Sequence, residues 1–555
     1  MPPQRRVPAK SAPTDSKNKP PEGLGSEELE KWNKQQAYHR KQASKYRSRI
    51  QALKSESKLK NIKPDNLSEK ANENNESGLC DPAEEIIQPT LFESSHTHEK
   101  LSCEPATEPD DPSLKRRTIS KDTSILDIEL KVVKRTFTLE SEVIGGDIVS
   151  STKRPKGLGP DGFSLTWNSI ASLVSLSASY CIPLNRLAAM LKNDFGAFSS
   201  GQISKILKWT AELMVPIYLY LADELADLNH LSGDDTSSRT IEMQAEQESI
   251  SEDSPFHAIN ERLGRASLLK DGSGFKKRLT LSVVTGRTDI QDKRSWIFFF
   301  RSHFGDLGNL VSRILSARSP KKREITIQSD LASFNKLEPM ITSLFKVTQA
   351  GCAAHGRRPI WKYRKDDPGF CYFLLRCFLA LARIERVLKE KQAGPNEILK
   401  YRRLYAGKVW SIILDRCKQL TGETPRRGDG EHCYRWPPDS DIFRGARYII
   451  RNYQALTEYL ENPEVFLTNN LCERLLRREK MIINGSKFRK NETGRITFDV
   501  LQTMVATCAA AGVKLRQYIP YVWKHRDDLD INPQLYTPLA FAKLQSSENR
   551  DLAAS

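Results

Sequence analysis

The spacing of apolar residues changes several times along the chain, and each change marks an expected element. From Ser26 to about Lys60 the apolar positions Leu29, Trp32, Ala43, Tyr46, Ile50 and Leu53 recur at three- and four-residue steps. This pattern predicts a helix, which is either one strand of a coiled coil or a solvated charged helix with an apolar edge. Further on, DIELKVVKRTFTLESEV alternates with period two between residues 125 and 149, which indicates a few short β-strands.

A helical period returns from residue 159 to residue 230, interrupted by the turn NDFGAFSSGQ. The helix after this turn is predicted to begin at Ser199 or Ser200 and to carry Gln202, Lys205 and Lys208. Two short helices that meet at a glycine-bearing turn are typical of a helix-turn-helix, although an ordinary helical hairpin has the same spacing.

The central part of the chain reads as a mixed α/β core. Strand-like segments lie at 278–286 and 295–302, the helical GDLGNLVSRILSAR follows, and REITIQSD forms a further strand that ends at Asp330. Residues 243–275 are rich in Glu, Ser and Gly and are expected to form a surface loop. The final elements are a helical pair, NNLCERLLRREKMII and ITFDVLQTMVATCAAAGV.

These patterns divide the chain into consecutive parts. We expect a disordered basic tail at 1–24, a helix at 25–60, an acidic linker at 61–117, a small β module at 118–158, a helical DNA-binding region at 159–230, the first part of the α/β core at 231–358, a helical insertion subdomain at 359–465, the last part of the core at 466–530 and a C-terminal tail at 531–555.

The charge balance favours a polyanionic partner. The chain has 86 Lys and Arg against 69 Asp and Glu, a formal net charge of +17, which attracts nucleic acid but also fits a soluble basic protein. Its 10 cysteines lack the density of a secreted disulfide scaffold. No apolar run reaches the roughly 18 residues of a membrane helix. We therefore expect a soluble protein of the cytoplasm with no membrane partner.

Four short strings carry the chemistry of the chain. They are LSGDDTSSRT at 231–240, IQSDLASFNK at 327–336, GCAAHGRR at 351–358 and NNLCERLLRREK at 469–480. In this order they resemble the insertion sequence 66 family of bacterial DDE transposases, and the likeness extends over most of residues 120–525. The resemblance implies a ribonuclease-H-like catalytic core with a helical insertion before the last acid, preceded by a helix-turn-helix-like DNA-binding region.

The resemblance assigns three acids, Asp234, Asp330 and Glu473, as catalytic metal ligands. Phosphoryl transfer at DNA needs charge neutralised on the attacking and leaving oxygens, which two Mg²⁺ or Mn²⁺ ions held by carboxylates can provide. Asp330 closes a predicted strand, where a rigid backbone can hold it beside a carboxylate from a neighbouring strand. Asp235 points to the opposite face from Asp234 if the segment is a strand, so only one of the two can serve.

Glu473 lies on a predicted helix whose Arg474, Arg477 and Arg478 offer a cationic surface to DNA phosphates. Taken alone, Glu473 would more often form an i,i+4 ion pair with Arg477 on a solvated face. Its place in a string shared with the family favours the catalytic role.

Cys352 and His355 form a C-x-x-H pair after the strand-like FKVTQAG. One Cys and one His make half of a zinc site at best, because a closed structural site takes four ligands. Similar pairs in other DDE families suggest that His355 contacts the DNA or the scissile phosphate while Cys352 packs the core; a surface histidine is the alternative. Arg357 and Arg358 beside them are candidate phosphate contacts or ordinary surface charges.

Relatives usually carry a cysteine-rich zinc module ahead of the helix-turn-helix. This chain offers only Cys80, His96, His98 and Cys103 there, without any C-x-x-C. The sequence therefore argues against zinc in the N-terminal region.

The resemblance implies a DNA transposase that recognises the terminal repeats of its element, hydrolyses DNA at the ends and uses the freed 3′ hydroxyl to attack target DNA. Because two ends must be held together, a homodimer or larger assembly is implied. The alternatives are a transposase-derived DNA-binding protein without cleavage activity and a metal-dependent nuclease without strand transfer.

Overall fold

The structure is a computed structural model that describes much of the C-terminal three-quarters of the chain. The described residues are 141–144, 147–151, 158–160, 165–195, 199–238, 250–264, 279–331, 337–365, 367–423, 438, 440–486 and 491–554. The predicted basic tail, N-terminal helix and acidic linker lie outside them. Of the predicted β module, the structure describes one antiparallel pair, β1 (Ser141–Ile144) and β2 (Asp147–Ser151).

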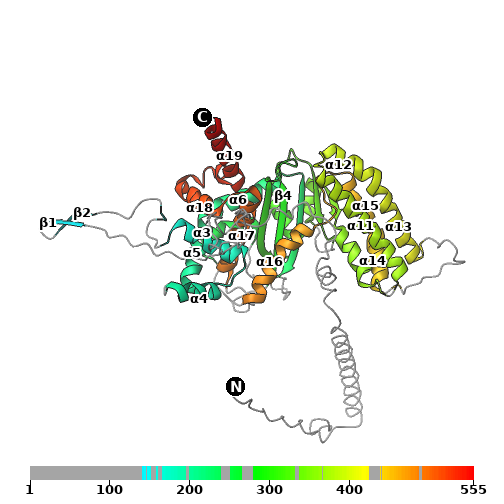
Figure 1. Cartoon of the computed structure of the whole chain (residues 1–555), viewed down its shortest axis with the longest axis horizontal. Coiled ribbons are helices and arrows are strands. Elements are labelled where there is room, and N and C mark those ends of the chain that lie inside the picture. Colours follow the sequence, from blue (N-terminus) through cyan, green and yellow to red (C-terminus); the bar gives the residue numbers. More distant parts are fainter. Residues whose placement is uncertain are drawn as a thin grey trace, which may run out of the picture. The chain divides into compact units, whose positions relative to one another are not determined.

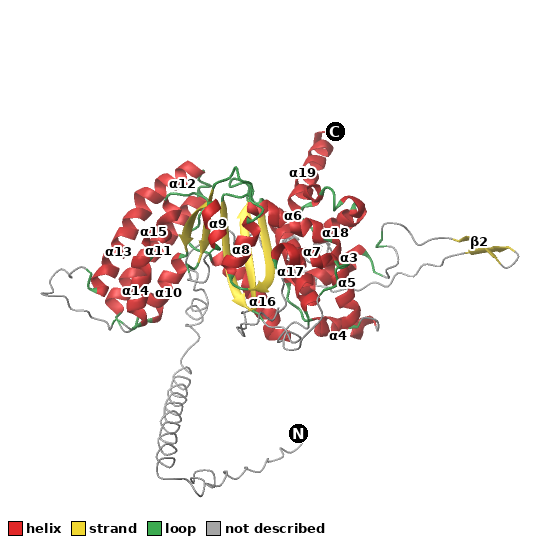
Figure 2. Ribbon diagram, turned by 180° about the vertical axis from the view of Figure 1, so that it is seen from behind, coloured by secondary structure: helices red, strands yellow, loops and turns green. Residues whose placement is uncertain are grey.

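A five-stranded mixed sheet organises the described residues (Figures 1 and 2). Its strands are β3 (His230–Ser237), β4 (Leu279–Arg287), β5 (Trp296–Phe304), β6 (Glu324–Ser329) and β7 (Lys346–Gly351), in the order β5-β4-β3-β6-β7. The first three strands pair antiparallel, whereas β6 and β7 run parallel to β3. The predicted mixed α/β core is therefore confirmed.

Alternate residues of the central strands enter two different hydrophobic cores. On β4 and β5, Val284 and Phe299 join the larger core, while Val283 and Phe300 join a smaller one. This alternation follows from the two-residue period of a strand. Helix α8 (Leu307–Leu315) contributes to the larger core, and α16 (Asn470–Ser486) to the smaller.

Helix α17 (Glu492–Ala511) covers the free edge of β5 with a ladder of side chains. The backbone N–H groups of Phe298, Phe300 and Ser302 donate to side-chain oxygens of Thr507, Thr503 and Asp499, at 3.2, 3.0 and 2.7 Å. The acceptors are four residues apart on the helix and the donors are two residues apart on the strand. These two spacings cover a similar distance, about 6 Å along the helix axis and about 6.6 Å along the strand, so successive donors and acceptors stay aligned. The ladder satisfies an edge that would otherwise be open to another strand.

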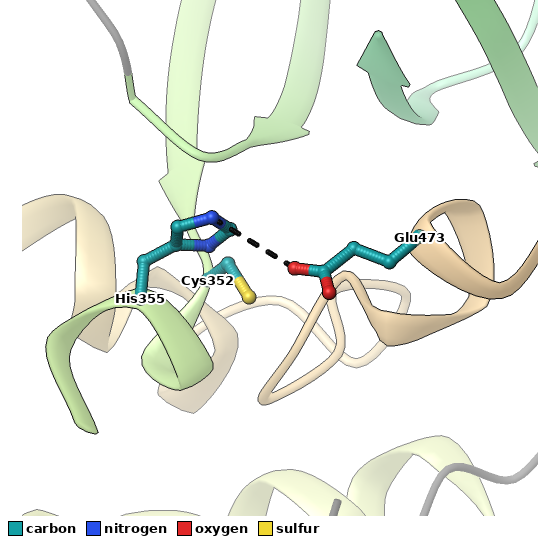
Figure 3. Close-up of side chains that lie close together, drawn as sticks. All are labelled: Cys352, His355 and Glu473. Atoms are coloured by element: carbon teal, nitrogen blue, oxygen red, sulfur yellow. Dashed lines mark ion pairs between the residues drawn. The ribbon is translucent and has the colours of Figure 1, made fainter. Parts of the chain in front are cut away.

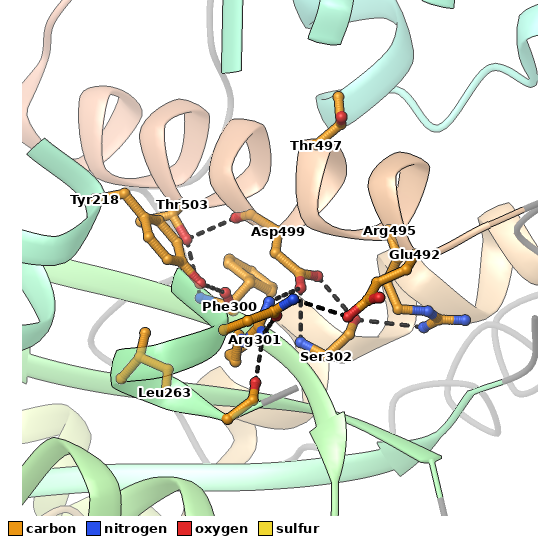
Figure 4. A network of polar contacts seen from close by, with 12 residues as sticks. Tyr218, Leu263, Phe300, Arg301, Ser302, Glu492, Arg495, Thr497, Asp499 and Thr503 are labelled. Carbon is orange, nitrogen blue, oxygen red and sulfur yellow. Dashed lines mark hydrogen bonds and ion pairs between the residues drawn. The ribbon is translucent and has the colours of Figure 1, made fainter. Parts of the chain in front are cut away.

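A buried polar network extends from this edge (Figure 4). The Arg301 guanidinium is fully buried and donates to the Asn260 side chain at 2.6 Å and to the Gly264 carbonyl at 2.5 Å. It also lies 3.6 Å from the carboxylate of Asp499, which accepts a 2.8 Å bond from the Ser302 hydroxyl. Burial raises the pKa of Asp499 to about 6, against the opposing effect of Arg301.

The region before the sheet is helical, as predicted. Its elements are α3 (Trp167–Val174), the π-helical segment η3 (Ser175–Ser179), α4 (Leu184–Phe195), α5 (Ser200–Leu213) and α6 (Val215–Ala226). Ser199 caps α5 in a capping box with Gln202, which explains why the helix begins there. The buried Ile203, Ile206 and Leu207 of α5 belong to the larger core.

The predicted surface loop at 243–275 is wrong in its middle, where α7 (Pro255–Leu263) forms. Ser254 caps this helix and Pro255 occupies its first turn, both favourable starts. Phe256 and Ile259 are fully buried in the larger core. The apolar stripe of this helix is short and flanked by polar residues, so the sequence pattern did not indicate a helix.

The helical subdomain between β7 and α16 has a hydrophobic core of its own. It comprises α10 (Ala353–Lys362), α11 (Pro368–Glu390), α12 (Pro395–Tyr401), the π-helical segment η6 (Arg402–Ala406), α13 (Gly407–Thr421), α14 (Asp441–Arg451), α15 (Tyr453–Thr457) and the 3₁₀ turn η7 (Glu458–Leu460); α9 (Pro339–Leu344) precedes β7. Helix α10 spans the expected boundary at 358/359, because Ala353 already packs into this core.

Much of the expected C-terminal tail is helical and packs on the core. After α18 (Leu515–Lys524) and the turns η8 (Arg526–Asp528) and η9 (Pro533–Tyr536), helix α19 runs over Pro538–Ala554. Tyr536, Leu539 and Phe541 are buried in the larger core. No single described helix is long and apolar enough to cross a membrane; α17 and α18 meet that test only as a pair, bent by 116°.

We expect Asp499→Ala to lower the free energy of unfolding by about 3 kcal/mol or more. The substitution removes the hydrogen-bond acceptor of Ser302 and leaves the buried Arg301 guanidinium without its carboxylate partner. Urea unfolding measures the change. Asp527→Ala, whose side chain is 89% exposed, is the control and should stay within about 0.5 kcal/mol of the wild type. Equal stability of the two variants would show that the network contributes nothing.

Candidate active site

Parallel pairing of β3 and β6 brings Asp234, in the middle of β3, beside Asp330, which directly follows β6. The register matches His230 with Thr326 and Ser232 with Gln328. Continued by two residues, it places Asp234 opposite Asp330, on the same face as the preceding pair. The Ser232 hydroxyl donates to the Gln328 side chain at 3.3 Å on that face. Two residues that are 96 positions apart in sequence therefore become neighbours.

The structure separates Asp234 from Asp235. Asp234 lies directly opposite Val283 of β4, and Val283 belongs to the smaller core beneath α16. Directly paired residues share a face, so Asp234 faces the α16 side. Asp235 faces the other side, where its carboxylate accepts a 3.1 Å bond from the Leu307 N–H at the start of α8. Asp235 therefore holds a helix end, and Asp234 is available to the site.

The charge environment of Asp234 reflects the other acids. Burial and, to a lesser extent, the negative charges of Glu473, Asp330 and Asp235 together raise its pKa to about 7. A 2.8 Å hydrogen bond from the Asp235 N–H acts in the opposite sense. Asp234 of β3 thus lies within electrostatic reach of Asp330, which follows β6, and of Glu473 on α16.

Glu473 reaches the sheet because α16 starts against it. The buried Asn469, just before the helix, donates from its side chain to the Gly233 carbonyl at 2.7 Å and from its backbone to the Cys352 sulfur at 3.2 Å. Its own carbonyl accepts from the Cys472 N–H at 3.1 Å. Asn469 therefore ties the first turn of α16 to the strand of Asp234 and to the C-x-x-H segment.

The carboxylate of Glu473 lies between two side chains of α10 (Figure 3). Its Oε1 is 3.8 Å from Nε2 of His355, the contact drawn in Figure 3. Its Oε2 is 3.6 Å from a guanidinium nitrogen of Arg358. The Glu473 side chain is only 18% exposed, which disfavours the alternative of a solvated pair with Arg477. Burial lowers the pKa of His355, and the nearby Glu473 opposes that effect.

Asp330 is positioned from its other side by the helical subdomain. The hydroxyl of Tyr448 on α14 donates to the Asp330 carbonyl at 2.9 Å. The next residue, Leu331, adopts a positive φ of 61°, which is uncommon for a side-chain-bearing residue. The chain thus turns sharply where β6 ends, and the aspartate is held at that turn.

The candidate DNA-contacting side chains come from three helices, α5, α10 and α16, and differ in exposure. Arg358 is 53% exposed beside Glu473, and Arg357 lies over the Trp361 ring at 5.5 Å. On α16, Arg477 is exposed and Arg474 is half-buried. On the same helix, Arg478 lies within electrostatic reach of Tyr180 and Cys181, and burial lowers its pKa. On α5, Lys205 is exposed and Lys208 pairs with Glu212 at 3.3 Å.

Sequence reasoning did not single out two positioning residues, Asn469 and Tyr448. Asn469 was visible only as part of a string, although an Asn at a helix start is a recognisable capping signal. Nothing in the local sequence marks Tyr448, which lies 118 residues from its partner Asp330.

Residues 317–495 match the family model described as "Transposase IS66 family". This stretch contains Asp330, the C-x-x-H pair, the helical subdomain and Glu473, so it joins the last three motifs in one transposase domain. Residues 317–495 therefore carry an IS66-family transposase domain, in agreement with the family that the four strings resemble. No curated protein and no solved structure matches it.

We expect Asp234→Asn to raise the free energy of unfolding of the metal-free protein at pH 8, by roughly 4 kcal/mol. The folded-state pKa of about 7 lies above the ordinary value of 3.8, so the native state resists ionisation and loses stability as pH rises between these values. The gain should therefore grow from about pH 4 and level off above about pH 7. Urea unfolding in chelator measures it, with the exposed Asp253→Asn as control; a gain independent of pH would contradict this account.

Proposed function

We propose that the chain is a DDE-type DNA transposase, which cleaves DNA at the ends of its mobile element and joins those ends to target DNA. The observation that carries the proposal is the proximity of three acids. The β3–β6 register brings Asp234 beside Asp330, and the charges of Glu473 and Asp330 contribute to the raised pKa of Asp234. The IS66-family match over residues 317–495 supports transposition as the setting of that chemistry.

We also propose that the sheet is a ribonuclease-H-like core. Three antiparallel strands are followed by two strands parallel to the first, in the order β5-β4-β3-β6-β7. The helical subdomain enters between the last strand and the helix of Glu473. This arrangement supports the fold that the family resemblance implies, with an insertion before the third acid.

The three acids fit a site for divalent cations. The Glu473 Oε1 atom is buried without a hydrogen-bond partner, and Asp234 is held where its negative charge is disfavoured in the absence of a cation. Carboxylate oxygens are the ligands that Mg²⁺ and Mn²⁺ accept. We propose that Asp234, Asp330 and Glu473 hold two such ions, which when bound supply charge neutralisation at the attacking and leaving oxygens of the phosphodiester.

Neighbouring side chains of α10 complete the proposed site. His355 stands beside Glu473 and is proposed to contact the DNA or the scissile phosphate. The lowered pKa of His355 favours its neutral form, which can donate from one ring nitrogen and accept at the other. Arg358 orients the second oxygen of Glu473 and, being 53% exposed, can also reach a phosphate.

The proposed partner is duplex DNA, both the terminal repeats of the element and the target. Helices α4 and α5 form the candidate helix-turn-helix, with Lys205 and Lys208 on the second helix. Arg357, Arg474, Arg477 and Arg478 are proposed as further phosphate contacts. Because two ends must be joined in one reaction, we propose that the active form is a homodimer or larger assembly.

Substitution of the acids tests the catalytic assignment. We expect Asp234→Ala, Asp330→Ala and Glu473→Ala each to abolish Mg²⁺-dependent cleavage and joining of DNA that carries the element ends, while end binding remains. Because the acids act as one unit, double variants should be little worse than single ones. Gel assays of cleavage and strand transfer, beside thermal unfolding of each variant, provide the measurement.

Asp235→Asn is the matched control, since it keeps an acceptor for the Leu307 N–H and should retain most of the activity. Full activity of Asp330→Ala would overturn the assignment. Binding of the ends without cleavage by the wild type would instead favour the DNA-binding alternative, and cleavage without joining would favour the nuclease.

The salt dependence of binding tests the helix-turn-helix proposal. The affinity of the full chain for end DNA should fall steeply with salt, with a log-log slope of about 0.9 per phosphate contacted. Lys205→Ala should reduce that slope by about 1, because it removes one contact. Lys346→Ala, at an exposed position on β7, is the control. A slope that is unchanged in Lys205→Ala would exclude that lysine from the interface.

A further inference from the structure

Three chemically different ligand atoms meet beside the proposed catalytic carboxylates. The Cys352 sulfur, a His355 ring nitrogen and a Glu473 carboxylate oxygen all lie within 4.8 Å of one another. Figure 3 shows the cysteine and histidine at the start of α10 facing the glutamate of α16. The sequence offered only the C-x-x-H half of this set, because the third ligand comes from a helix 118 positions after His355.

The atoms of this cluster are available to a ligand. Oε1 of Glu473 and Nδ1 of His355 are both buried without a hydrogen-bond partner in the described structure. Arg358 lies against the other carboxylate oxygen, so it does not occupy Oε1. Unsatisfied buried polar atoms are costly, and a cation bound at Oε1 of Glu473 would relieve that cost for the carboxylate.

The donor set selects the kind of cation. A sulfur, an imidazole nitrogen and one carboxylate oxygen suit zinc, whereas Mg²⁺ takes oxygen ligands almost exclusively. Tetrahedral ligands of zinc lie about 3.5 Å apart, so side-chain movements of about an ångström complete the site. Three protein ligands leave a fourth position for water. The Asn469 N–H, 3.2 Å from the Cys352 sulfur, would stabilise the thiolate as an outer hydrogen bond.

We propose that Cys352, His355 and Glu473 form a zinc site that shares Glu473 with the catalytic carboxylates. An occupied site withdraws Glu473 from Asp234 and Asp330, and His355 from the DNA. Zinc is therefore an inhibitor of this chain. The inhibition rests on the proposed function; the binding site does not.

Cobalt serves as the spectroscopic probe of binding, because Co²⁺ bound to a thiolate absorbs in the near ultraviolet. The full chain titrated with Co²⁺ should develop this band with one equivalent bound at Cys352, and Zn²⁺ should displace it. Cys352→Ser should lose the band and bind Zn²⁺ about tenfold or more weakly in calorimetry.

Controls separate this site from other ligands in the chain. Cys377→Ser changes a half-buried cysteine of α11, and a Cys80→Ser/Cys103→Ser variant removes the N-terminal sulfurs; both should keep the band. Asp234→Ala should also keep it, since that acid belongs only to the catalytic set. If Cys352→Ser fails to fold, His355→Gln replaces it and should weaken Zn²⁺ binding. A band that survives the loss of Cys352, or that never forms in the wild type, overturns the site.

Inhibition is measured as cleavage in Mg²⁺ with and without Zn²⁺, each variant being compared with its own rate in Mg²⁺ alone. At zinc concentrations that saturate the site, the cleavage rate of the wild type should fall about tenfold. The same zinc concentration should slow Cys352→Ser by a factor that is several-fold smaller. Equal inhibition of the two proteins would overturn the inhibitory role. If the wild type never cleaves, the proposed function fails, whereas the cobalt experiment still decides whether the site exists.

Discussion

The constraint on which this structure depends is the repulsion between carboxylates that the fold holds together. Burial of Asp234, together with the smaller effect of the nearby charges of Glu473 and Asp330, raises its pKa to about 7. Such a group opposes folding at neutral pH, so the surrounding contacts must offset it. The β3–β6 register fixes the two aspartates, and Asn469 fixes the helix of the glutamate.

The site lies where two separately packed parts of the chain meet. The sheet is stabilised by cores on both faces and by the side-chain ladder from α17 to the edge of β5. The helical subdomain has its own core, yet it supplies His355 and Arg358 to Glu473 and the Tyr448 hydroxyl to Asp330. A change in the packing of this subdomain would therefore alter the site without touching an acid.

Much of the sheet could be predicted from the sequence, because β4 and β5 are nearly continuous apolar runs and β6 ends on a polar residue. The choice between Asp234 and Asp235 could not be made, since it depends on which face α8 covers, and the Leu307 N–H reveals this only in three dimensions. Helix α7 and the packing of α19 were missed because their apolar stripes are short. The third ligand beside the C-x-x-H pair was missed because long-range contacts leave no local pattern.

The central claim is that the three acids bind metal together, and iron-directed cleavage of the polypeptide tests it without DNA. With hydrogen peroxide as oxidant and ascorbate as reductant, Fe²⁺ bound at a Mg²⁺ site generates hydroxyl radicals that cut the nearby backbone, and the fragments are mapped by mass spectrometry. We expect cuts near Asp234, Asp330 and Glu473 that excess Mg²⁺ suppresses, and we expect those near Asp234 and Asp330 to disappear in the Asp234→Ala/Asp330→Ala double variant. Cuts elsewhere in the chain, or an unchanged pattern in the double variant, would contradict this claim.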